Sequence, residues 1–109
     1  MSTVTIAAGK AVSTPLDLTS AAVTMVIAPA EWTPANITFP VSIDGVNFFD
    51  LADAASGVEI SRVIQPSTAV KVDQSYTRYA NHLKVRSGPR DHPIAQEADR
   101  VLTLVTSRV

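Results

Sequence analysis

The feature that most restricts the fold is an alternating run of apolar and polar residues that ends at an Asp-Gly pair. A period of two over residues 36–43 is typical of a strand with one buried and one exposed face. The apolar set is Ile37, Phe39, Val41 and Ile43. Asp44-Gly45 tolerates the positive φ angles of a tight turn, so residues 46–51 are predicted to return as the second strand of a hairpin. Pro40 has no N–H to donate, which indicates a sheet edge or a bulge at that position.

The composition also favours strands. Val, Ile and Thr account for 32 of the 109 residues, and branching at Cβ disfavours helix. Seven prolines interrupt any long helix. We therefore expect a mostly-β chain.

Further short apolar runs predict further strands. They cover residues 22–28, 58–60, 68–72, 79–86 and 100–106, and the last run is apolar on both faces. A helical turn is expected only within residues 73–78 or 94–99. This spacing of strands and turns predicts an all-β, jelly-roll-like β-sandwich of about eight short strands in one domain, residues 1–109. The expected core is Phe39, Val41, Phe48, Leu83, Val85, Leu102 and Leu104.

The first 20 residues leave two alternatives open. Val4 and Ile6 alternate with Thr3 and Thr5, which suits a strand with one exposed face. Residues 1–20 are expected to be either an edge strand or an extended arm that orders against a partner.

Composition excludes several classes of protein. Hydrophobic residues make up 46% and charged residues 17%, with a formal net charge of -1, so disorder and a basic nucleic-acid-binding module are not expected. No apolar run reaches the roughly 18 residues of a membrane-spanning helix. The chain has no cysteine, so disulfides and thiolate chemistry are excluded. We expect no nucleic acid and no membrane among its partners.

Four oxygen-bearing residues lie within ten positions, namely Asp44, Asn47, Asp50 and Asp53. Calcium needs several carboxylates converging from one flexible segment. Asp44 belongs to the tight turn and Asp50 to the return strand, so turn formation is the favoured interpretation and a structural calcium ion is the alternative.

No catalytic arrangement is evident. His82 and His92 are the only histidines, too few for a zinc site without cysteine, and His82 is expected to point outward from a strand. No G-x-S-x-G and no glycine-rich phosphate loop is present. We expect a protein that is not an enzyme and that holds no metal and no cofactor.

Charge is unevenly distributed along the chain. Residues 1–54 carry one Lys and five acids, whereas residues 55–109 carry eight cations and five acids. The stretch 76–90 has no acid before Arg90, and its cations are Arg78, Lys84, Arg86 and Arg90. These residues form either a solvated strand face or a cationic face that docks on an acidic partner.

Trp32 is the only tryptophan and lies in a loop between Pro29 and Pro34. It is expected to be a plug under one end of the sandwich, an interface anchor or a platform for a sugar ring. Together with Arg78, Lys84, Arg86 and Arg90, Trp32 is our candidate for a partner interface.

Three segments, residues 32–39, 41–51 and 82–88, carry a family resemblance. The middle one resembles the S-x-D-G-x-x-(aromatic)-x-x-L hairpin of discoidin-like jelly rolls, the galactose-binding-domain-like sandwiches. The alternation over residues 79–86 is similar to a later strand of that family. Residues 32–105 also resemble small proteins encoded among the structural genes of tailed bacteriophages.

The resemblance implies a sandwich fold and a role as a virion component. Discoidin domains are longer, often carry a terminal disulfide and bind ligands through long loops, and this chain lacks those features. The resemblance to phage structural proteins implies a capsid decoration (cement) protein that docks on the assembled shell and bridges capsid subunits. The alternative is a carbohydrate-binding or accessory domain of a phage tail or baseplate.

The same resemblance sets expectations for partners and location. The expected partners are the major capsid protein and further copies of the chain, with a trimer favoured. The expected location is the capsid surface of the virion. Absence of cysteine fits assembly in the reducing cytoplasm of a bacterial host.

Overall fold

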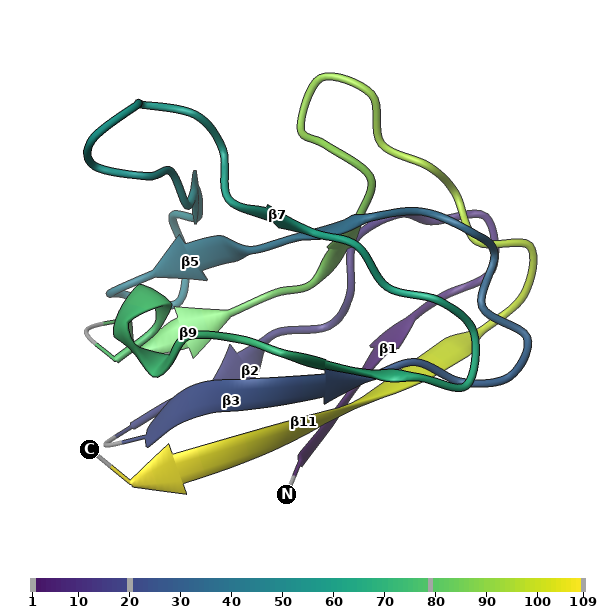
Figure 1. Ribbon diagram of the computed structural model, residues 1–109, viewed down its shortest axis with the longest axis horizontal. Coiled ribbons are helices and arrows are strands. Elements are labelled where there is room, and N and C mark those ends of the chain that lie inside the picture. Colours follow the sequence, from purple (N-terminus) through teal and green to yellow (C-terminus); the bar gives the residue numbers. More distant parts are fainter. Residues whose placement is uncertain (1, 20, 79, 109) are drawn as a thin grey trace.

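The protein is all-β and sandwich-like, as the sequence predicts, and its strands form three antiparallel sheets. The computed structural model describes residues 2–19, 21–78 and 80–108. Figure 1 shows one sheet along the bottom of the view, with β5, β7 and β9 lying above it. Within the described residues, no helix is long and apolar enough to cross a membrane.

The lower layer, sheet A, has four strands in the order β1-β11-β3-β8. Their bounds are β1 Ser2–Ile6, β11 Arg100–Arg108, β3 Ala21–Ile27 and β8 Ala69–Lys71. The two apolar runs predicted at residues 22–28 and 100–106 thus become the two central strands. Of the two alternatives for the start of the chain, residues 2–6 form the edge strand, because β1 pairs along its whole length with β11.

The upper layer contains sheet B, ordered β10-β4-β7, and sheet C, ordered β2-β9-β5-β6. The bounds in sheet B are β10 Arg86–Ser87, β4 Ile37–Thr38 and β7 Ser61–Arg62. Those in sheet C are β2 Leu16–Asp17, β9 His82–Leu83, β5 Pro40–Ser42 and β6 Phe49–Asp50. One 3-10 turn, η1 Gln74–Tyr76, lies in the first of the two segments predicted to be helical.

Pro40 explains why β4, β5, β9 and β10 are shorter than the predicted strands. Residues 37–42 pair with residues 82–87 in one antiparallel register, from Ile37 opposite Ser87 to Ser42 opposite His82. The ladder is interrupted only around Pro40, which has no N–H to donate. The predicted strands 36–43 and 79–86 are therefore each divided in two, and Tyr79, where the second begins, lies outside the described residues.

The core lies between the two layers. Five of the seven predicted core residues have an exposed fraction of 0%, namely Phe39, Leu83, Val85, Leu102 and Leu104. Val41 is half-buried and packs against this cluster. The prediction that Phe48 belongs to the core is wrong, because Phe48 is half-buried and lies outside the core cluster. Its ring lies 4.2 Å from Lys84 Nζ, and Lys84 points to the outer side of the layer because it is one residue from the buried Leu83 and Val85.

Candidate functional site

The residues of the predicted basic stretch do not form one cationic face. Arg86 retains 9% of its surface exposed and is part of an ion cluster. Lys84 is half-buried beside the ring of Phe48. Arg78 and Arg90 are exposed. Arg86 is already paired within the chain, so only Arg78 and Arg90 of this stretch are exposed enough to dock on a partner.

Arg86 is the centre of a charged cluster on the outer side of the upper layer. Its Nη2 donates to Asp50 Oδ1 at 2.7 Å and also to Glu59 Oε2, and its Nε donates to Thr38 Oγ1 at 3.0 Å. Arg90 adds a longer contact, with Nη1 3.7 Å from Asp50 Oδ2. Two carboxylates on one guanidinium form a compact arrangement of charge-assisted hydrogen bonds.

This cluster ties two long loops to the upper layer. Glu59 ends the loop that includes Gly57, and its Oε1 accepts from the backbone N–H of Arg90 at 3.1 Å. Thr38 Oγ1 donates to the carbonyl oxygen of Gly88 at 2.8 Å. Figure 1 shows both loops rising from the top of the view. A cleft of about 300 Å³ lies between them, lined by Asp50, Ala52, Gly57, Val58, Glu59, Arg90 and Asp91.

Trp32 is a buried plug and not an exposed anchor. Its exposed fraction is 2%, and its Nε1 donates to the carbonyl oxygen of Ala35 at 3.3 Å. The neighbouring Thr33 donates its N–H to Gln96 Oε1 at 2.9 Å, and Gln96 Nε2 donates to Ser87 Oγ at 2.7 Å. The interface and sugar-platform alternatives for Trp32 therefore do not match its position.

The Asp-Gly pair forms a turn that is held by side chains. Asp44 Oδ1 accepts from the backbone N–H groups of Val46 and Asn47, both at 2.8 Å, and Asp44 Oδ2 accepts from Asn47 Nδ2 at 2.9 Å. The hydrogen bonds from Asn47 and Val46 hold the pKa of Asp44 well below its usual range. Gly45 has a φ of 79°. The turn interpretation of Asp44 and Asn47 is the one that the geometry supports.

The base of this turn is fixed against β9. Asn81 donates its N–H to the carbonyl oxygen of Ser42 at 2.9 Å and its Nδ2 to the carbonyl oxygen of Ile43 at 2.9 Å. The ring of His82 lies so close to Gly45 that a Cβ there would be 3.0 Å from Nε2. The hairpin tip, residues 43–49, is therefore attached to the sheet at several points.

The hairpin tip exposes three large apolar side chains. The exposed fractions are 73% for Ile43, 79% for Val46 and 65% for Phe49. The alternating pattern places Ile43 inward, but the strand ends at Ser42 and the chain leaves the sheet there. Sequence reasoning missed these residues as surface groups. The available signal was the apolar residue on each side of Asp44-Gly45, because turns usually carry polar neighbours.

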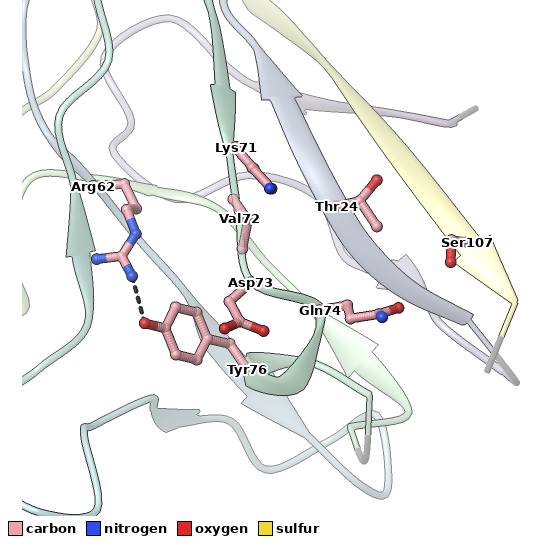
Figure 2. Close-up of a pocket in the computed structure, with 8 residues that line it drawn as sticks. All are labelled: Thr24, Arg62, Lys71, Val72, Asp73, Gln74, Tyr76 and Ser107. Atoms are coloured by element: carbon pink, nitrogen blue, oxygen red, sulfur yellow. Dashed lines mark hydrogen bonds between the residues drawn. The ribbon is translucent and has the colours of Figure 1, made fainter.

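A second surface feature is a groove of about 620 Å³ beside β8, shown in Figure 2. Its polar side chains come from β3, β7, β8, β11 and η1 with its N-cap residue: Thr24, Arg62, Lys71, Ser107, Asp73, Gln74 and Tyr76. Arg62 Nη2 donates to the hydroxyl of Tyr76 at 2.6 Å, and the guanidinium carbon lies 4.9 Å from the ring centroid. A hydrogen bond from the backbone N–H of Ser75 lowers the pKa of Asp73.

The four acidic and amide residues proposed as a calcium alternative serve different contacts. Asp44 holds the turn, Asp50 binds Arg86, and Asp53 Oδ1 accepts from the N–H of Ala55 at 2.8 Å. In the part of the chain that the structure describes, no three His, Cys, Asp or Glu side chains come together in a way that could hold a metal ion.

No family model matches the chain, and neither a curated protein nor a solved structure is significantly similar to it.

Proposed function

We propose that this chain is a non-enzymatic structural protein of a virion, a capsid decoration or cement protein that docks on the assembled shell and bridges capsid subunits. The virion assignment rests on the resemblance of residues 32–105 to small phage structural proteins. The observation that carries the docking is the hairpin tip, which presents Ile43, Val46 and Phe49 with 73%, 79% and 65% of their surfaces exposed.

The physical argument is one of burial at low entropic cost. Burying an aliphatic side chain contributes about 1.5–3 kcal/mol, and more of it is retained when the loop is already ordered. Asp44 and Asn81 order this tip in the free chain. Apolar side chains held out on an ordered loop are typical of a surface that meets another protein.

We expect the purified chain to co-sediment with assembled shells that lack it, and the double variant Ile43→Ser/Val46→Ser to bind roughly 100-fold more weakly. Each substitution removes about 1.5 kcal/mol of burial, and their sum corresponds to that factor. The measurement is the bound fraction against chain concentration in a sedimentation assay.

The matched control is Val63→Ser, which removes a side chain of 65% exposure from the connection between β7 and β8. Its affinity should stay within about two-fold of the wild type. A wild-type chain that ignores such shells contradicts the proposal, and a double variant that binds as tightly as the wild type contradicts the role of the tip.

The groove in Figure 2 supports a second candidate, a carbohydrate-binding accessory domain of a phage tail or baseplate. Tyr76 supplies an aromatic ring, and Asp73, Gln74 and Lys71 supply acceptors and donors for sugar hydroxyls around about 620 Å³ of space. We expect at least one glycan of a broad panel to bind, and Gln74→Ala to weaken that binding about ten-fold. Exposed Gln65 offers the control Gln65→Ala. A flat response across the panel removes this candidate.

A further inference from the structure

The two central strands of sheet A have apolar side chains on both faces. On the inner face, Val26 of β3 and both Leu102 and Leu104 of β11 have an exposed fraction of 0%. The alternate residues point the opposite way, because successive side chains of a strand alternate between faces. Strands that are apolar on both faces are typical of sheets covered on both sides.

The cross-strand register defines the outer face of sheet A. One row of directly opposed residues crosses the four strands, and it consists of Thr3, Thr103, Ile27 and Ala69. A neighbouring row runs from Val105 through Met25 to Lys71. Directly opposed residues share a face. With Thr5 and Val101, the outer face consists of Thr3, Thr5, Met25, Ile27, Ala69, Lys71, Val101, Thr103 and Val105.

None of these side chains is buried in the free chain, and Val101 keeps 50% of its surface exposed. Figure 1 shows sheet A as the bottom layer, with no other described segment below it. Lys71, on the edge strand β8, is the only charged residue of the outer face. Protein surfaces in contact with water usually have about a quarter to a third of charged residues, both signs mixed.

We propose that the outer face of sheet A is the contact between two copies of this chain, packed face to face about a two-fold axis parallel to the strands. A face whose one charged residue lies on an edge strand can meet its own copy without like charges opposing each other at its centre. This axis places β3 over β11 of the second copy and β8 over β1. Ala69 then faces Thr3, and Ile27 faces Thr103.

The size of the face predicts a weak, concentration-dependent dimer. Four strands about 4.8 Å apart and the nine residues of β11 at about 3.4 Å each cover on the order of 400–500 Å² per copy. A standard stable interface buries about 800 Å² per partner. Pairing at this face leaves the hairpin tip of sheet C free, so a dimer presents two tips and gains avidity on a shell. The pairing itself does not depend on the proposed docking.

The test is the mass in solution of the wild type and of Thr103→Lys, measured by sedimentation velocity from about 1 µM to 1 mM. Thr103 lies on β11, one of the two central strands. Its side chain forms no hydrogen bond with the described residues, so the substitution removes no hydrogen bond within that part of the chain. We expect the wild type to move from monomer to dimer over this range. Thr103→Lys should stay a monomer, because two ammonium groups would oppose the apolar centre of the pair. Ser61→Lys, on the exposed part of β7, is the control and should dimerise as the wild type does.

Cysteine cross-linking provides the second measurement, and the absence of native cysteine makes it unambiguous. A short bis-maleimide cross-linker should join Thr103→Cys into a covalent dimer and leave Val63→Cys a monomer, because packed sheets lie about 10 Å apart. A wild type that stays monomeric up to 1 mM, or a Thr103→Lys variant that associates like the wild type, overturns the proposal. The trimer favoured from the resemblance would also overturn it, because a closed three-fold ring cannot bring the same face of two copies together.

Discussion

Replacing Arg86 by methionine is expected to lower the free energy of unfolding by roughly 3 kcal/mol. Methionine keeps the length and apolar stem of arginine but removes the guanidinium that binds Asp50 and Glu59. Glu59 is then left without its cation and Asp50 keeps only the longer contact with Arg90, and the two side chains are only 17% and 29% exposed. The measurement is the urea midpoint followed by far-ultraviolet circular dichroism.

The matched control for this prediction is Arg90→Met. The Arg90 side chain is 68% exposed and lies 3.7 Å from Asp50, so its loss should cost less than about 1 kcal/mol. The triple variant Arg86→Met/Asp50→Asn/Glu59→Gln should regain part of the lost stability, because it removes the unpaired negative charges. Equal midpoints for Arg86→Met and the wild type would show that the cluster does not hold the two loops in place.

Replacing Trp32 by alanine is expected to cost about 3–5 kcal/mol. The side chain is one of the largest fully buried groups and packs in the same cluster as Phe39, Leu102 and Leu104. Alanine leaves a cavity that the surrounding strands can only partly close. A loss of that size is a large fraction of the usual 5–15 kcal/mol stability of a domain.

Trp32→Phe is the control, because it keeps an aromatic ring and most of the volume. We expect it to cost about 1–2 kcal/mol. Circular dichroism is again the readout, since both substitutions remove the tryptophan signal. If Trp32→Ala unfolded at the wild-type urea midpoint, Trp32 would have to be accessible to solvent or to a partner, and the plug interpretation would be wrong.

The strand content and the central strands could be predicted from the sequence because they depend on local pattern. β-Branched composition and the apolar runs at residues 22–28 and 100–106 identified β3 and β11. The alternation over residues 36–43 found the correct inner set as far as Val41. It failed at Ile43, since a period of two contains no information on where the strand ends.

The charged cluster could not be predicted, because its partners are far apart in the sequence. Asp50 and Glu59 lie 36 and 27 residues before Arg86. The local sequence pattern predicts that Arg86 and Lys84 lie on the same outer face, either solvated or docking on a partner. The side of the layer to which Arg86 points is predicted correctly. Only the fold brings the two loops over the outer side of the layer and buries Arg86 there.

The division of residues 79–86 into β9 and β10 has a similar cause. The pairing with residues 37–42 keeps one register, but Pro40 lies in the opposite strand and supplies no donor where the ladder needs one. The sequence of residues 79–86 alone does not predict where this strand is interrupted, because the interruption is caused by a residue of the strand that it pairs with.

The measurement that tests the proposed function most directly is a near-atomic image of a phage virion assembled in the presence of the chain. We expect copies of the chain on the outer surface of the capsid shell, with Ile43 and Val46 of the hairpin tip buried against capsid subunits. Copies located in the tail, or copies on the shell whose hairpin tips face solvent, would contradict it.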